Sequence, residues 1–234
     1  MGAIYRREMG AFFTSGVAYV FLAVFYVFSG YYFYNDVIQS GFTDASPLFK
    51  NMFRIVLFLI PILTMRLLSE EKKNRTDQGL LTAPIGLSEI VVGKYLAALT
   101  IYIIAESIIF VYAIILGYLG DVVWATLLGN YFAMLLLGAA FIAVGLFISS
   151  LTENQMTAAV FSMAVLFVCY LSSSFTDKIE TKWLNDLVKE LSFYDRYIEF
   201  TQGIFNLTSV LFYISAAFLF NFFTVRVLEK RRWS

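Results

Sequence analysis

Residues 65–95 read MRLLSEEKKNRTDQGLLTAPIGLSEIVVGKY. This stretch holds the densest block of charge in the chain: Glu70, Glu71, Lys72, Lys73, Arg75 and Asp77. Long apolar runs lie on both sides of it, and each is long enough to enter a membrane. Because an isolated ion in hydrocarbon costs several kcal/mol, the stretch must lie on one face of a bilayer. Its lysines and arginines predict the cytoplasmic face, since short cytoplasmic loops are rich in these residues.

The composition is that of a membrane protein. The chain has 234 residues, of which 60% are hydrophobic and 15% charged, whereas soluble domains have about 45–50% apolar and about 25% charged residues. The apolar residues gather in runs long enough to cross about 30 Å of hydrocarbon as helices. We therefore predict an all-α, polytopic membrane protein with one transmembrane domain over residues 1–234. Its six spans are expected at residues 17–34, 52–68, 90–116, 124–149, 156–175 and 207–228.

Three further helices are predicted outside the spans. Residues 1–16 favour an interfacial helix, with Arg6 and Arg7 facing the lipid phosphates and Glu8 beside them. Ser69 to Leu81 contains good helix formers and predicts a cytoplasmic helix between spans two and three. Residues 176–203 show apolar positions at helical spacing with acids between them, which predicts an outer amphipathic helix, broken near Ser192.

The basic residues predict the orientation. With six spans, both termini lie on one side, and we expect that side to be the cytoplasm of a cell with this protein in its plasma membrane. Of the 17 Lys and Arg side chains, the inner side then holds Arg6, Arg7, Arg66, Lys72, Lys73, Arg75, Lys94, Arg226, Lys230, Arg231 and Arg232. The outer side holds only Lys50, Arg54, Lys178, Lys182, Lys189 and Arg196.

Polar and helix-breaking residues mark points of interest within the spans. Pro61 removes a backbone hydrogen bond and predicts a kink in span two. Ala139 and Ala143, four residues apart in span four, predict close helix packing. Glu106 is the ionisable residue at depth in span three, and an intramembrane carboxyl is a functional candidate by default. The structural alternative is a carboxyl that is neutral, or hydrogen-bonded to Ser, Thr or Tyr of a neighbouring helix.

The chain offers no catalytic constellation. It has no histidine, a single cysteine and zero net charge, which argues against a metal site, a histidine-based triad and nucleic-acid binding. Gly86 to Lys94 looks faintly like a phosphate-binding loop, but six residues separate the glycines and Tyr95 follows the lysine. We therefore expect no enzyme activity and no cofactor in this chain.

The stretch quoted above resembles the type-2 ABC exporter permease family. That pattern has an acidic-basic helix, a Thr, a Leu-Leu pair, a Pro and a Gly-Lys pair opening span three. The matching residues are Glu70-Glu71-Lys72, Thr76, Leu80-Leu81, Pro84 and Gly93-Lys94. The family often has Gly before the Thr, where this chain has Arg75. The starting Arg6-Arg7-Glu8 and the basic ending also look like the family. Because no large outer domain is present, the chain is similar to gliding-motility and copper-enzyme-maturation permeases.

The resemblance implies a membrane-spanning subunit that forms a substrate pathway. Such a subunit pairs with a second copy or a related permease and with separate ATP-binding cassette subunits, which bind ATP and magnesium. The residues implied in ATPase coupling are Glu70, Glu71, Lys72, Arg75, Thr76, Leu80, Leu81 and Pro84, helped by the interfacial helix. We expect the charged ones to form rim contacts and Leu80 and Leu81 to act as apolar anchors.

Two other functions remain open from the sequence. A self-contained secondary transporter or channel could use Glu106 as a proton or ion carrier, although the spans show no clear repeat of one half in the other. A membrane scaffold or intramembrane enzyme is the third possibility, but no catalytic set supports it. The favoured function is export by an ABC permease, with a substrate that the sequence does not identify.

Overall fold

A computed structural model describes residues 1–41, 44–76, 78–79, 85–120, 122–175, 190 and 192–232. In these residues all regular structure is helical, as predicted. The helices are α1 (Gly2–Thr14), α2 (Val17–Tyr32), the π-helix η1 (Phe33–Ile38), α3 (Ser46–Thr64), α4 (Arg66–Lys73), α6 (Leu87–Glu106), α7 (Ile108–Leu119), α8 (Trp124–Leu151), α9 (Gln155–Phe175), α11 (Phe193–Thr201) and α12 (Leu207–Arg232).

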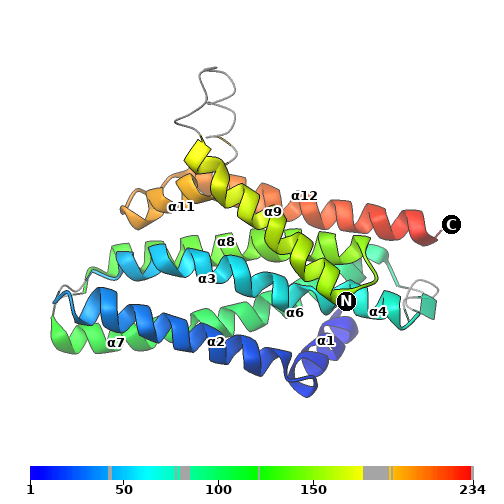
Figure 1. Ribbon diagram of the computed structural model, residues 1–234, viewed down its shortest axis with the longest axis horizontal. Coiled ribbons are helices and arrows are strands. Elements are labelled where there is room, and N and C mark those ends of the chain that lie inside the picture. Colours follow the sequence, from blue (N-terminus) through cyan, green and yellow to red (C-terminus); the bar gives the residue numbers. More distant parts are fainter. Residues whose placement is uncertain are drawn as a thin grey trace.

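Six helical segments are long and apolar enough to cross a membrane, which confirms the predicted number of spans. They are Val17–Ile38, Ser46–Lys73, Leu87–Leu119, Trp124–Leu151, Gln155–Ser172 and Leu207–Arg232. The segments form one elongated bundle (Figure 1). One end of the bundle carries α1, α4 and the C-terminal end of α12, and we call it the α4 end. The opposite end carries η1, the end of α7 and α11, and we call it the α11 end.

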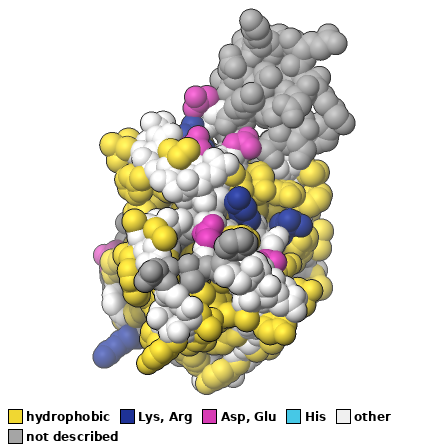
Figure 2. Space-filling view, turned by 90° about the vertical axis from the view of Figure 1, so that its left-hand side faces the viewer, with side chains coloured by type: hydrophobic (Ala, Val, Ile, Leu, Met, Phe, Trp, Pro, Cys, Tyr) yellow, Lys and Arg dark blue, Asp and Glu magenta, His cyan; other side chains and the backbone are white. Residues whose placement is uncertain are grey.

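The surface fits a bundle that spans a bilayer. Figure 2 looks onto the α11 end, where acidic and basic side chains gather in the middle. Hydrophobic side chains surround this charged area and continue onto the flanks of the bundle. Charges at the end and apolar side chains on the flanks are what a hydrocarbon layer around the helices requires.

Helix α8 forms the centre of the bundle. In its most apolar stretch of 18 residues, 78% of the residues are buried, against 22% in the corresponding stretches of α9 and α12. Two glycines on α8 allow neighbouring helices to come close. A Cβ at Gly138 would lie 2.2 Å from the ring of Tyr102, and a Cβ at Gly145 would lie 2.1 Å from Thr64 Oγ1. The sequence prediction had assigned close packing to Ala139 and Ala143. Gly138 and Gly145 make the closest approaches among the described glycines, and close packing at Ala139 and Ala143 stays a prediction.

The second span is interrupted at Met65, after the kink that the sequence predicts at Pro61. Helix α3 runs through Pro61 without interruption and ends at Thr64, and α4 begins after a turn at Met65. At this break Ser149 of α8 replaces lost helical hydrogen bonds. Its Oγ accepts the N–H groups of Leu68 and Ser69, both at 3.1 Å, and donates to the Met65 carbonyl at 2.9 Å. The break is therefore held by a side chain from the central helix.

The described part of the segment between the fifth and sixth spans enters the bundle. Ser192 caps α11 by accepting the Asp195 N–H at 3.2 Å, which agrees with the predicted break near Ser192. Helix α11 packs one face into the bundle, and its predicted place at the outer surface stays a prediction. Figure 1 shows it alongside α8 and α12, and Tyr197, fully buried, donates to the Phe49 carbonyl of α3 at 2.9 Å. Residues 176–189 of the predicted helix lie outside the described residues.

Candidate functional site

A buried lysine joins three helices at the α4 end. Lys94 of α6 is only 1% exposed. Its Nζ donates to the Leu67 carbonyl at 2.6 Å and lies 3.0 Å from a carboxylate oxygen of Glu8 and 3.0 Å from one of Glu71. All three hydrogens of the ammonium group can thus be directed at oxygen atoms of α1 and α4, which is what a buried lysine requires.

An arginine completes the cluster. Arg7 of α1 donates to Glu8 Oε1 at 2.7 Å and also pairs with Glu71 of α4. Two cations and two carboxylates therefore form a charge-balanced group, the Arg7–Glu8–Glu71–Lys94 cluster. Each carboxylate contacts both cations. The Arg7 side chain is half exposed, whereas Lys94 and the two carboxylates are largely buried. Because a buried charge is stable only while its partners are present, the Lys94 pairs tie α1, α4 and α6 together.

The electrostatics of the cluster favour the charged state of its acid. Burial alone would raise the pKa of Glu8, but Lys94 and Arg7 outweigh this effect and hold the pKa below its usual value of 4.5. Burial alone would lower the pKa of Arg7, and the neighbouring carboxylates raise it instead. Glu8 is therefore an ionised carboxylate at neutral pH, and the cluster is an ion network.

Gly93 explains how α1 reaches the cluster. A Cβ at this position would lie 3.1 Å from Ile4 Cγ2 and 3.2 Å from Ile4 Cβ, closer than ordinary contact. Ile4 is itself buried against α6. The Gly93-Lys94 pair therefore combines a small residue that admits α1 with a lysine that binds it. This accounts physically for the pair that the sequence analysis noted at the start of the third span.

The rest of α4 is fixed to the central helix. Lys72, which is 9% exposed, donates from Nζ to the Ser150 carbonyl at the end of α8. Together with the bonds from Ser149 at the start of α4, this contact holds both ends of the helix against α8. Movement of α4 is therefore coupled to α8 as well as to α1 and α6.

Helix α4 ends earlier than predicted. The sequence indicated one helix from Ser69 to Leu81, but the helix ends at Lys73. The Thr76 N–H bonds to the Glu71 carbonyl at 3.0 Å, and the Arg75 N–H bonds to the Lys72 carbonyl at 3.1 Å. These two bonds are those of a Schellman motif, in which the residue after the C-cap is left-handed. Arg75 has φ of 56°, a conformation that favours glycine, which explains why the family often has Gly here.

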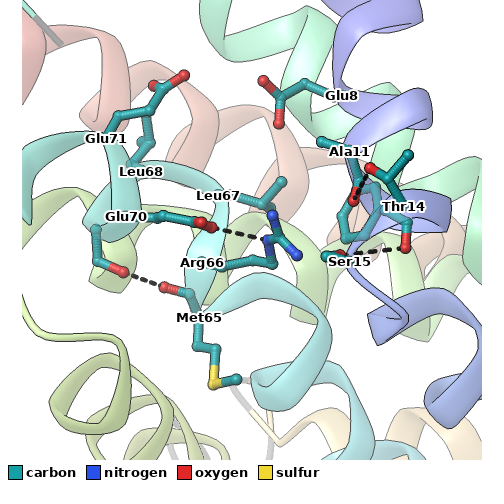
Figure 3. Close-up of polar contacts among 12 residues, drawn as sticks. Glu8, Ala11, Thr14, Ser15, Met65, Arg66, Leu67, Leu68, Glu70 and Glu71 are labelled. Atoms are coloured by element: carbon teal, nitrogen blue, oxygen red, sulfur yellow. Dashed lines mark hydrogen bonds and ion pairs between the residues drawn. The ribbon is translucent and has the colours of Figure 1, made fainter. Parts of the chain in front are cut away.

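A cavity lies beside the cluster. Its volume is about 320 Å³, and it is lined by Arg7, Glu8, Ala11, Arg66, Leu67, Glu70, Glu71, Asn74, Thr76 and Lys94. Figure 3 shows the carboxylates of Glu8 and Glu71 turned toward the same space from α1 and α4. It also shows the ion pair between Arg66 Nε and Glu70 Oε2, at 3.0 Å. The polar lining makes this a charged recess between α1, α4 and α6.

The structure brings together only part of the predicted set. Glu8 and Glu71 meet in the cluster with Arg7, while Arg6 is exposed on α1. The expectation that the charges of this stretch form exposed rim contacts is wrong for Glu71 and Lys72, because both side chains point inward. Arg75 and Thr76 are exposed at the end of α4. The predicted positions Leu80, Leu81 and Pro84 lie outside the described residues.

Sequence reasoning did not identify Ser149 and Ser150, which hold α4 against α8. Both are fully buried, although serine is usually exposed. The sequence signal for this role was the pair of adjacent serines at the end of the long fourth span, on the side of the membrane that carries the charged stretch. Their role depends on the break at Met65, which the sequence did not indicate.

Glu106, the predicted intramembrane site, is far from this cluster along α6. It is the last residue of α6, and Ser107 separates it from α7. The side chain is 0% exposed, and neither carboxyl oxygen has a hydrogen-bond partner in the described part of the chain. Among the described residues no Ser, Thr or Tyr donates to this carboxyl, so the hydrogen-bonded alternative is not observed there.

Comparison with known protein families supports the resemblance noted in the sequence. Residues 3–227 match the model of a family described as ABC-2 family transporter protein. No curated protein matches the chain significantly. The family match covers nearly the whole chain, including the first five membrane segments and most of the sixth. Permeases of this kind work with ATP-binding cassette subunits. The chain therefore belongs to the ABC-2 transporter family and is a multi-pass membrane permease subunit.

Proposed function

We propose that the chain is the permease of an ABC exporter and that the α4 end receives the motion of a separate ATPase. The observation that carries this proposal is the Arg7–Glu8–Glu71–Lys94 cluster, in which the buried Lys94 and the half-exposed Arg7 join α1, α4 and α6 by ion pairs. In this arrangement a push on α4 reaches the second and third membrane segments and helix α1 at once. The family match favours this function over a self-contained transporter or channel.

The physical basis is the stiffness of a paired, buried network. Removing one partner of a buried ion pair typically costs about 3–5 kcal/mol, because the other charge stays buried without compensation. An ATPase that displaces α4 therefore moves α1 and α6 with it more easily than it separates them. Ser149 and Ser150 extend the same rigid unit to α8.

The orientation is part of the proposal. We place the α4 end and both termini in the cytoplasm, because eleven of the 17 basic residues fall on that side. Cysteine labelling of intact cells tests this, with Cys169→Ser as the background. We expect Lys73→Cys, which is exposed on α4, to be protected from a membrane-impermeant reagent, and Lys50→Cys at the other end to react. Reaction of position 73 from outside would overturn the orientation.

Docking of the ATPase is tested in the segment that follows α4. We propose that Leu80 and Leu81 anchor the ATPase, because desolvated apolar anchors typically cost 2 kcal/mol or more when truncated. The variant Leu80→Ala with Leu81→Ala should insert normally but co-purify less ATPase. Lys73→Ala, which removes an exposed charge at the end of α4, is the matched control. It should lose little ATPase binding, since exposed ion pairs contribute about 0–1 kcal/mol. Equal ATPase binding in all three proteins would contradict the docking role.

A further inference from the structure

Glu106 lies at an irregular point in the middle of a membrane span. Helix α6 ends at this residue and α7 begins at Ile108, so the span from Leu87 to Leu119 is interrupted beside a buried carboxyl. Non-helical backbone at membrane depth is tolerated where it is buried in protein. The Glu106 side chain is fully buried, and both oxygens lack a hydrogen-bond donor among the described residues.

In the described part of the chain, no cation is paired with this carboxyl. The titratable side chains that interact with it are tyrosines from three elements, namely Tyr102 of α6, Tyr131 of α8 and Tyr197 of α11. The hydroxyl of Tyr102 donates to the Met134 carbonyl at 2.8 Å, and that of Tyr197 donates to the Phe49 carbonyl at 2.9 Å. These two hydroxyl protons are therefore used elsewhere. An ionised carboxylate without donors or a counter-ion is highly unfavourable in such a place.

A second buried acceptor lacks a donor at the same level of the bundle. Tyr102 bonds to Met134 and Phe110 packs on Tyr131, so the antiparallel register of the third span and α8 places Glu106 opposite residues 130–134. Asn130 in this stretch is fully buried, and its Oδ1 has no hydrogen-bond partner in the described structure. Its Nδ2 donates to Ser46 Oγ at 3.3 Å, which fixes the orientation of the amide.

The hydrogen bonds continue from Asn130 to the α11 end of the bundle. Ser46 accepts from Asn130 and donates from Oγ to Asp44 Oδ1 at 2.7 Å, and Asp44 is exposed. A small cavity of about 10 Å³ borders Asp44, Thr126 and Asn130, which is enough for about one water molecule. Every donor in this series points toward Asp44, so the inner end of the series, Asn130 Oδ1, requires a donor.

We propose that Glu106 is a proton-binding site within the membrane, joined to the α11 end by Asn130, Ser46 and Asp44. A proton on Glu106 supplies the missing donor, and its O–H bonds to Asn130 Oδ1 directly or through one water molecule. The same proton removes the charge from the carboxyl, so two unsatisfied acceptors are explained by one ligand. Protons reach the site by water entering beside Asp44, on the side away from the ATPase-coupling cluster. The site does not rest on the proposed coupling role.

A sodium ion is the competing ligand, because it would also bind acceptor oxygens. It needs several oxygen ligands in a defined shell. The cavity at Asn130 is only about 10 Å³, and the free oxygens come from two side chains, Glu106 and Asn130. A proton needs one acceptor and almost no volume. We therefore commit to the proton, and the experiment separates the two.

Infrared difference spectroscopy of the purified full-length permease in lipid nanodiscs tests the site. The wild-type protein should show the carbonyl stretch of a protonated carboxyl at neutral and mildly alkaline pH, and Glu106→Gln should lack that band. Sodium should leave the band unchanged. In Asn130→Leu the band should remain and shift to higher frequency. Exchange of the Glu106 proton into D₂O should slow about tenfold, because leucine cannot bind the water or make the hydrogen bond that joins Glu106 to Ser46; a tenfold change corresponds to about 1.4 kcal/mol. Ser46→Ala should slow it less.

The control is Asn221→Leu, which removes another intramembrane asparagine whose Oδ1 has no partner in the described residues. It lies on α12 and outside the series, so the band and its exchange should match the wild type. Loss of the band on adding sodium, or absence of the band in the wild type, would overturn proton binding. Unchanged band frequency and exchange in both Asn130→Leu and Ser46→Ala would overturn the connection to Asp44.

Discussion

Glu8 and Glu106 are both buried acids, but their surroundings differ in kind. Glu8 contacts Arg7 and Lys94 in a network with zero net charge, and its pKa lies below the usual value because these cations outweigh burial. Glu106 lies among tyrosines with no donor for either oxygen in the described structure. Burial alone therefore does not decide what an acid does in this bundle. The neighbouring groups decide it. Two cations make Glu8 part of an ion network at the α4 end, and the lack of donors makes Glu106 a proton site in the membrane interior.

The largest expected effect comes from removing the shared cation. Lys94→Met leaves Glu8 and Glu71 buried with only Arg7 between them, and the loss of stability should be about 3–5 kcal/mol. Thermal unfolding in detergent measures this. Lys73→Met, an exposed lysine on α4, is the matched control and should stay within about 0.5 kcal/mol of wild type. A Lys94→Met protein as stable as the control would show that the cluster does not hold the helices together.

Tight packing on α8 can be tested separately near each region. A methyl group at Gly145 meets Thr64 near the α4 end, and one at Gly138 meets Tyr102, one turn from Glu106. Gly145→Ala and Gly138→Ala should each cost about 1–3 kcal/mol through overpacking. Gly129→Ala, where nothing lies within 4 Å of the new Cβ, should be neutral or stabilising. If all three variants unfold alike, the close approaches are not important to the fold.

Neutral amide substitutions sharpen the comparison of the two acids. Glu8→Gln should cost about 1.5–3 kcal/mol, because it removes charge-assisted hydrogen bonds to Arg7 and Lys94. Glu106→Gln should cost less than about 1 kcal/mol, because the native carboxyl is already neutral. We also expect ATP-driven transport to survive Glu106→Gln. A larger loss of stability for Glu106→Gln than for Glu8→Gln would reverse the assignment of charge.

The pH dependence follows from the lowered pKa of Glu8. A lowered folded-state pKa adds stability that is fully present above the unfolded value, near 4.5, and is lost as the pH falls through the folded value. Wild-type stability should therefore decrease as the pH falls below about 5, and Glu8→Gln should show a weaker decrease. Thermal unfolding at a series of pH values measures both curves. If stability fell equally with pH in the wild type and in Glu8→Gln, the cations would not be acting on Glu8.

The smallest expected effect concerns the end of α4. Arg75 is left-handed, with φ of 56°, and glycine adopts this conformation without the steric cost of a side chain. Arg75→Gly should stabilise the protein by about 0.5–1 kcal/mol. Arg75→Ala keeps the strain and loses the charge, so it separates the two contributions. Stabilisation by alanine and not by glycine would contradict the backbone explanation.

The membrane segments were predictable because apolar length is a local property of the sequence. The ends of the segments were less so: η1 extends the first span to Ile38, and the third reaches Leu119. The sequence did not show which charged side chains would point into the bundle, because Lys94, the partner of Glu8, lies on a helix that begins at Leu87, far along the chain. The break at Met65 likewise depends on Ser149, a residue of another span. Local patterns identified the residues, and long-range contacts decided their roles.

Transmission through the Arg7–Glu8–Glu71–Lys94 cluster is tested most directly by a distance measurement. Glu71→Gln with Lys94→Gln detaches α4 from α6 while leaving the Arg7–Glu8 pair, so the charge remains balanced. The permease is assembled with its ATPase in nanodiscs, with Cys169→Ser and a spin label at Tyr118→Cys, an exposed position at the α11 end. The distance between the labels of two copies is measured with and without trapped ATP and magnesium. We predict that the double variant binds the ATPase and hydrolyses ATP but loses the ATP-dependent change in distance, whereas Lys73→Gln keeps it. An undiminished change in the double variant would contradict the account.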